Sequence, residues 1–98
     1  MSGLYNVLVG AFAGDALNGN GSGADQNVAI GNGALGADVE GNKSTAVGYA
    51  ALLAQNFSTN TESHNTAIGH NAGLSVTTGI NNSILGSGAG DALTTGGY

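Results

Sequence analysis

The chain has 98 residues, of which 19 are glycine and none is proline or cysteine. Without cysteine it has neither a disulfide framework nor a thiolate metal site. Six acidic residues against the single Lys43 give a net charge of −5, which repels phosphate backbones and anionic lipid, and no apolar run is long enough to cross a bilayer as a helix. We therefore expect no nucleic-acid partner and no membrane insertion.

One short pattern recurs five times along the chain: a polar Asn or Ser, three short or aliphatic residues, and a glycine. It occupies residues 6–10, 27–31, 44–48, 65–69 and 82–86. The leading residues are alternately 21 and 17 positions apart, which indicates a 17-residue period with two four-residue insertions, near 18–23 and 57–61. A short fixed period is typical of stacked structural units. The sequence therefore predicts one all-β domain, a parallel β-solenoid of five coils that span 6–26, 27–43, 44–64, 65–81 and 82–98.

Each occurrence predicts a strand from its second to its fourth residue, ended by a glycine at a corner with positive φ. These corner glycines are Gly10, Gly31, Gly48, Gly69 and Gly86. Two apolar columns are predicted to fill a narrow coil interior. One is the aliphatic residue before the glycine (Val9, Ile30, Val47, Ile68, Leu85), and the other is the alanine three residues after it (Ala13, Ala34, Ala51, Ala72, Ala89).

The leading polar residues form a third column, made of Asn6, Asn27, Ser44, Asn65 and Asn82. Stacked coils would place them about 4.8 Å apart, the ordinary spacing of neighbouring strands. Side-chain amides at that spacing hydrogen-bond along the stack and fix the turns that flank them. We interpret this column as structural and not as a ligand site.

Two glycine-rich segments resemble known binding motifs. Residues 31–36 match the dinucleotide-binding pattern, but Asp38 and Glu40 follow where a phosphate-binding helix should run, and the same glycines recur elsewhere as corners. Residues 21–25 resemble part of a calcium-binding nonapeptide repeat, but the pattern occurs only once, so a glycine loop is favoured over a metal site in 18–25. We expect no cofactor, and leave that metal open.

The two histidines lack Cys or acidic partners at ligand spacing, and hydroxyls and carboxylates do not converge on one end of a unit. His64 and His70 are therefore expected to be exposed or stacked, although His70 could form a ring with its copies in an oligomer. Phe57 is the single aromatic residue in the insertions and is expected to pack back over the coil more readily than to meet a partner. The sequence favours a protein that is not an enzyme.

The segments Asn27-Val28-Ala29-Ile30-Gly31 and Asn65-Thr66-Ala67-Ile68-Gly69 resemble the head repeats of trimeric autotransporter (YadA-like) adhesins, and similar repeats occur in bacteriophage tail fibres. This resemblance implies a left-handed β-roll in which three chains pack around an axis, each giving one strand face to a shared core. The family's repeat unit is usually shorter than 17 residues. This chain also shows no heptad stalk, signal peptide or membrane barrel, which is unlike a whole adhesin.

The ends of the sequence repeat one another, because Gly3, Leu4 and Tyr5 precede Asn6 much as residues 96–98 would precede a further Asn. Neither end has a cap, so a seam between copies is predicted at Leu4, Tyr5, Gly97 and Tyr98. We expect a structural fibre or filament subunit, a homo-oligomer that works in an extracellular filament or a virion fibre. The alternative is an adhesin or phage module that recognises a host-surface glycan or protein, although the five aromatic residues are few and dispersed.

Overall fold

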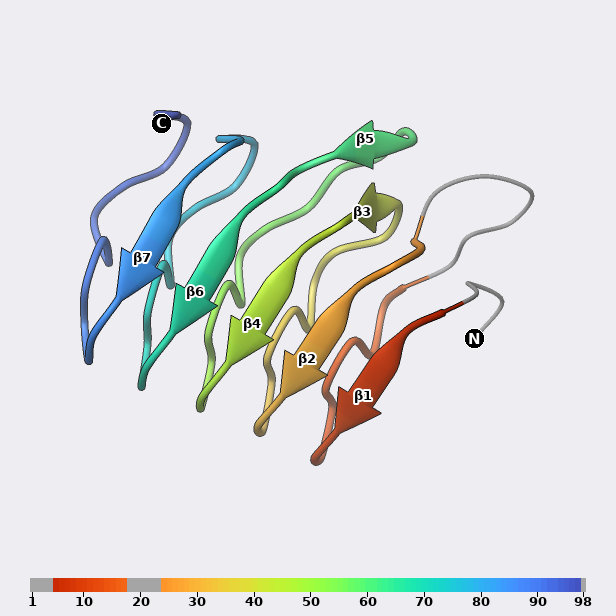
Figure 1. Cartoon of the computed structure of the whole chain (residues 1–98), viewed down its shortest axis with the longest axis horizontal. Helices are drawn as coiled ribbons and strands as arrows, with labels where there is room; N and C mark the ends of the chain where they lie inside the picture. Colours follow the sequence, from red (N-terminus) through yellow and green to blue (C-terminus); the bar gives the residue numbers. More distant parts are fainter. Residues whose placement is uncertain (1–4, 18–23, 98) are drawn as a thin grey trace.

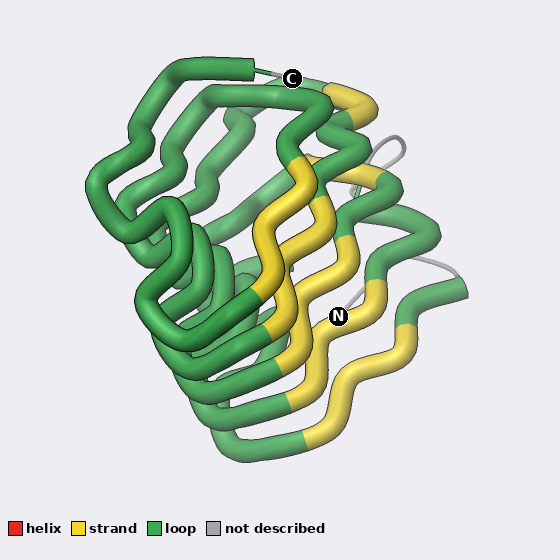
Figure 2. The backbone as a smooth tube through the Cα atoms, turned by 60° about the vertical axis from the view of Figure 1, so that its left-hand side comes forward, coloured by secondary structure: helices red, strands yellow, loops and turns green. Residues whose placement is uncertain are grey.

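The computed structural model describes residues 5–17 and 24–97. Within these residues the chain is all-β without a helix, and it winds as a parallel β-solenoid of about four turns (Figures 1 and 2). The main sheet has the order β1-β2-β4-β6-β7, and β3 pairs with β5 in a second, short sheet. The strands are β1 (Val7–Val9), β2 (Val28–Ile30), β3 (Gly41–Asn42), β4 (Thr45–Val47), β5 (Thr61–Glu62), β6 (Thr66–Ile68) and β7 (Ser83–Leu85). Leu4, Tyr98 and the insertion at 18–23 lie outside the described residues.

The register of the main sheet follows the sequence repeat. Val28 pairs with Val7 on one side and with Thr45 on the other, and the same step continues through Thr66 to Ser83. Every pairing therefore joins residues at the same position of the repeat, whether 17 or 21 residues separate them. The additional residues of the longer spacings are taken up outside this sheet.

The pleat of these strands runs opposite to the prediction. The middle residue of each strand points into the coil, and this interior column is Leu8, Ala29, Ala46, Ala67 and Ile84. The prediction that the aliphatic residue before the glycine lies inside is wrong: Val9 is 54% exposed and Leu85 79%, Ile30 and Ile68 are exposed, and Val47 is half-buried. Since side chains alternate along a strand, the second and fourth positions share the outer face and only the third faces the core.

The core is completed by the turn after the corner glycine. The alanine column contributes Ala34, Ala51 and Ala72, all fully buried, with Ala13 and Ala89 packed against the same cluster. One residue further along, the chain places Gly14, Leu35, Leu52, Gly73 and Gly90.

The residue that follows the alanine column is small where the residue at the strand centre is large, and large where the strand centre is alanine in the second and third units. Gly14 faces Leu8, because a Cβ built on Gly14 would lie 2.7 Å from Leu8 Cδ2. Gly90 faces Ile84 in the same way. In the second and third units the strand centre is alanine and the facing residue is a buried leucine. The fourth unit is small at both positions, Ala67 and Gly73, and there the neighbouring units fill the space: a Cβ on Gly73 would lie 3.0 Å from Leu52 Cδ2 and 3.1 Å from Ile84 Cδ1.

The corner glycines are needed for a close approach between neighbouring units. They have φ between +119° and +139°, and a Cβ on Gly31 would lie 2.5 Å from the carbonyl oxygen of Gly48. A side chain there would collide with backbone as well as strain φ. The residue before each leading Asn or Ser is also left-handed, with φ between +50° and +61°, although none is glycine: Tyr5, Gln26, Lys43, His64 and Asn81.

Candidate functional site

The column of leading polar residues links each unit to the next through the backbone. Asn27 donates its backbone N–H to Asn6 Oδ1 at 3.0 Å, and Ser44 donates to Asn27 Oδ1 at 2.9 Å. Asn82 donates to Asn65 Oδ1 at the same distance. The side-chain amide nitrogen of each Asn donates a hydrogen bond to a backbone carbonyl near the end of its own unit: Asn6 to Ala24, Asn27 to Gly41, Asn65 to Gly79 and Asn82 to Gly96. The column thus fixes both the stacking and the last turn.

Ser44 is the exception in this column, because its side chain is too short to reach the next unit. The hydroxyl of Ser63 accepts the backbone N–H of Asn65 in its place, at 3.1 Å, and lies 2.5 Å from Ser44 Oγ. Gln55 fills the remaining space: its Nε2 donates to Ser44 Oγ at 2.8 Å, and its Oε1 accepts from Asn65 Nδ2 at 2.8 Å. All four side chains are fully buried.

Asp38 extends this buried network into the second unit. Its Oδ2 accepts from Gln55 Nε2 at 2.7 Å, and its Oδ1 accepts the backbone N–H groups of Phe57 at 2.9 Å and Gly41 at 3.2 Å. Burial raises the pKa of this carboxyl, and the hydrogen bonds from Phe57, Gln55 and Gly41 oppose the rise. Both carboxylate oxygens of Asp38 accept hydrogen bonds, and two of the three donors, Gln55 and Phe57, belong to the third unit. The site is therefore suited to holding the second and third units together.

Sequence reasoning missed this network. Asp38 and Gln55 occupy the same position of successive units, where the first and last units have Leu17 and Leu93 and the fourth has Val76. Comparison of that one position across units is the signal that could have found the pair. The sequence gives no such signal for Ser63, because it follows the insertion of the longer third unit and has no equivalent position in the 17-residue units.

The two motif-like segments are structural elements of the stack. In 31–36, Gly31 is a corner, and Gly33 donates its N–H to the carbonyl of Ala11 at 3.0 Å. In 21–25, only Ala24 and Asp25 are described. Ala24 is buried, and Asp25 donates its N–H to Asn42 Oδ1 at 3.0 Å. Across residues 5–17 and 24–97, no three His, Cys, Asp or Glu side chains gather as metal ligands would.

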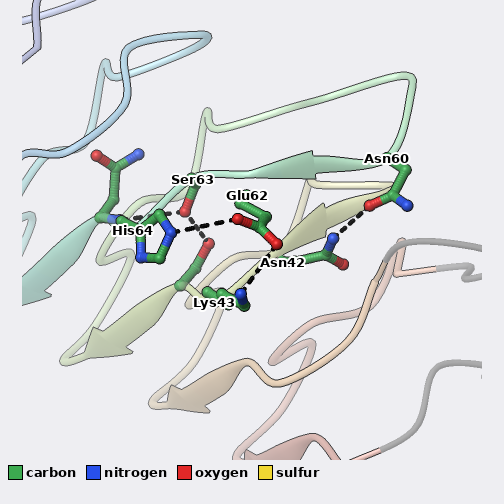
Figure 3. A network of polar contacts seen from close by, with 8 residues as sticks. Asn42, Lys43, Asn60, Glu62, Ser63 and His64 are labelled. Atoms are coloured by element: carbon green, nitrogen blue, oxygen red, sulfur yellow. Dashed lines mark hydrogen bonds and ion pairs between the residues drawn. The ribbon is translucent and has the colours of Figure 1, made fainter.

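The histidines lie on the outside of the stack. His64 Nε2 is 3.5 Å from one carboxylate oxygen of Glu62, while Lys43 Nζ is 2.9 Å from the other (Figure 3). Lys43 and His64 lower the pKa of Glu62, with hydrogen bonding to Lys43 the largest cause. His70 stacks on Tyr49 of the preceding unit, with ring centroids 5.1 Å apart.

The insertion within the third unit is tied to the second unit. Thr61–Glu62 pairs with Gly41–Asn42, and the side chains of Asn42 and Asn60 are hydrogen-bonded (Figure 3). Phe57 is only 6% exposed, which confirms the expectation that it packs back over the coil. This edge of the stack thus has charged and amide groups that already have partners within the chain.

The outer face of the main sheet carries the main apolar surface. Val7 and Val9 of β1, Ile30 of β2, Ile68 of β6 and Leu85 of β7 are all exposed, with Val47 of β4 half-buried between them. Thr45, Thr66 and Ser83 alternate with these residues on the same face. We call this surface the aliphatic face. Because the strands pair in register, Val9, Ile30, Val47, Ile68 and Leu85 stack in one column, and Val7 lies in the column beside it.

The last unit ends the stack in an open hollow of about 550 Å³. Apolar residues of the core, Ile84, Ala89 and Leu93, line it together with Gly90 and Gly96. β7 is an edge strand, since it pairs only with β6 in the main sheet. The predicted seam residues Tyr5 and Gly97 are both exposed. A backbone edge and an apolar cross-section are therefore presented together at this end.

No family model, curated protein or solved structure matches the chain. No helix in the described ranges has the length and apolar character needed to span a membrane.

Proposed function

We propose that this protein is a structural fibre or filament subunit that assembles with copies of itself, both side by side and head to tail. In this proposal the solenoid is a left-handed β-roll of five coils with a 17-residue period, and three chains pack around a common axis. In this proposal the protein is part of an extracellular filament or a virion fibre. The proposal assigns no chemistry to the chain.

The aliphatic face carries the proposal of side-by-side packing. Val9 of β1, Ile30 of β2 and Ile68 of β6 project from the main sheet into solvent. A continuous apolar surface of this kind marks an interface more often than a free surface. These side chains cannot turn into the coil, because the third residue of each strand faces the core and side chains alternate along a strand. A second and third copy would bury them.

The free edges support head-to-tail stacking. In every observed junction the glycine N–H of the later unit donates to the aliphatic carbonyl of the earlier one, as Gly86 does to Ile68 at 2.9 Å. A copy stacked on β7 in the same register would let its Gly10 N–H meet the carbonyl of Leu85. Because such a contact does not close on itself, it generates an open fibre.

Side-by-side packing is tested by substitution of the aliphatic face. Ile30→Ser with Ile68→Ser removes two exposed side chains, so the fold of the single chain is retained while, in sedimentation velocity, trimers give way to single chains or to single-file stacks of them. The matched control is Leu53→Ser, because Leu53 is 38% exposed against 37% and 40% for the two isoleucines but lies on a turn. Equal oligomeric states for the double variant and the control would contradict the proposal.

Recognition of a host-surface glycan or protein is the second candidate. The exposed pair of Tyr49 and His70 favours it, since a tyrosine presents an apolar ring and a polar hydroxyl and is enriched at interfaces. Tyr49→Ala should then abolish binding to receptor-bearing cells and leave the assembly intact. Binding that is unchanged by Tyr49→Ala would remove this candidate.

A further inference from the structure

The two ends of the stack carry the same five residues. Ala13-Gly14-Asp15-Ala16-Leu17 in the first unit is repeated as Ala89-Gly90-Asp91-Ala92-Leu93 in the last. The local structure is also repeated, since Asp15 N–H donates to the carbonyl of Phe12 and Asp91 N–H to that of Gly88, both at 3.2 Å. Both aspartates are exposed.

The intervening units have no charge at this position. There the equivalent residues are Gly36, Leu53 and Leu74. Lys43, the single Lys or Arg of the chain, pairs with Glu62 at the insertion edge, and His70 stacks on Tyr49. Asp15 and Asp91 are therefore not neutralised by any cation that the structure places beside them within the described residues.

The register of the stack extends to this turn. Gly14 N–H donates to the carbonyl of Ala34 at 2.8 Å, and the equivalent bond recurs from Leu35 to Ala51, from Leu52 to Ala72 and from Gly73 to Ala89. The next bond in the series would join Gly90 N–H to Ala13 of a second copy. That contact places Asp91 directly beside Asp15 of the second copy, with backbones about 4.8 Å apart.

We propose that Asp15 and Asp91 form a like-charge contact between stacked copies, so that end-to-end assembly is held back at low ionic strength and released by salt. This inference rests on the proposed head-to-tail stacking and names the residues that regulate it. Two unit charges about 5 Å apart at a protein surface weaken association by between about fourfold and about three hundredfold. Half-molar salt, with a screening length of a few ångströms, removes most of that penalty.

A charge-reversal cycle tests the contact. Asp91→Lys and Asp15→Lys each create an opposite-charge pair at the seam, so each should lower the protein concentration needed for polymerisation at 20 mM salt by at least tenfold. The double variant restores two like charges and should polymerise as poorly as the wild type. Light scattering gives the threshold concentration, and circular dichroism checks that each variant is folded.

The double variant is also the control for net charge. It is less negative than either single variant, so a general charge effect would make it polymerise most readily. That result, or single variants that match the wild type at 20 mM salt, would overturn the inference and leave stacking intact. If the wild type and every variant remain single units long at 500 mM salt, head-to-tail stacking is wrong and the inference is overturned with it.

Discussion

The middle of the stack and its two ends solve the same packing problem with different residues. In the second and third units the strand centres are alanine, and the position eleven residues after the leading Asn or Ser is polar: it holds Asp38 and Gln55, which are hydrogen-bonded to each other. In the first and last units the strand centres are Leu8 and Ile84, and the position of Asp38 and Gln55 is occupied by leucine, Leu17 and Leu93. A buried polar group needs neighbours to satisfy it, and an end unit has a neighbour on one side only. The ends therefore present apolar residues, which tolerate a missing neighbour and can pack against a new one.

The largest expected effect comes from an alanine at a corner in the middle of the stack. Gly31→Ala would place a Cβ 2.5 Å from the carbonyl of Gly48 at a φ of +127°, and should cost about 3–6 kcal/mol, a large share of the stability of a domain this size. Gly86→Ala has the same φ, but its nearest heavy atom is Ala89 Cβ at 3.7 Å, so only strain of about 1–3 kcal/mol is expected. Denaturant unfolding of both variants measures the difference. Equal losses would mean that backbone contact between units is not what requires the glycine.

The compensation of residue sizes predicts the next effect. Leu35→Gly empties the core of the second unit and should cost about 3 kcal/mol. Ala29→Leu alone should overpack it at a cost of about 1–3 kcal/mol. The double variant reproduces the pattern of the end units, so its loss should be smaller than that of Leu35→Gly, with a coupling of at least about 1 kcal/mol in the unfolding cycle. Simple additivity would show that the two positions do not share one space.

The buried carboxylate gives the middle of the stack a pH dependence. Burial raises the pKa of Asp38 in the folded chain, so the folded state holds that proton over a range in which the unfolded state has released it. Its contribution to the free energy of unfolding is thus greatest below the unfolded pKa of about 4 and is lost as the pH rises through the higher, folded pKa. Asp38→Asn should cost about 1–3 kcal/mol, because an amide group would face Gln55 Nε2.

The difference between wild-type and Asp38→Asn melting curves at several pH values isolates this carboxyl from the other acidic groups. The difference should change between about pH 4 and neutrality. A flat difference would show that Asp38 titrates alike in the folded and unfolded chain.

The smallest expected change in the free energy of unfolding comes from glycine at the left-handed residue before a leading Asn, and it should be the same in the first unit and in the third. Gln26 and His64 are both exposed, precede a leading Asn, and have φ of +58° and +50°. Gln26→Gly and His64→Gly relieve the strain of a left-handed residue and should each raise the free energy of unfolding by about 0.5–1 kcal/mol. Thermal unfolding in matched buffers suffices to compare them. A loss of stability in either variant would mean that its side chain contributes more than the strain removes.

The sequence predicted the strands well because each begins and ends at the same repeat position. All five strands of the main sheet coincide with the second to fourth residues of the pattern, and the pairing register follows the repeat through both insertions. The error was the orientation of the pleat. The prediction put the larger aliphatic residue inside, whereas the third residue of each strand faces the core, as Ala29 and Ala46 do, and Ile30 on the opposite face of the pleat is exposed.

The buried polar network could be predicted only in part. Asp38 and Gln55 differ from the other residues at their position, and that departure is visible in the sequence. Their hydrogen-bond partners are not, because Ser63 and the backbone of Phe57 reach the network from a unit that is four residues longer. The stacking of His70 on Tyr49 follows from register alone, since the two residues occupy one position in successive units.

Electron microscopy of the wild type beside Gly86→Ala, at 500 mM salt and equal concentration, tests most directly whether the ends of the stack join copies. A Cβ on Gly86 points where the next copy would lie, since in every earlier unit it meets the following corner glycine. We expect long filaments from the wild type and none from a folded Gly86→Ala variant. Filaments of equal length from both proteins would contradict head-to-tail stacking through this edge.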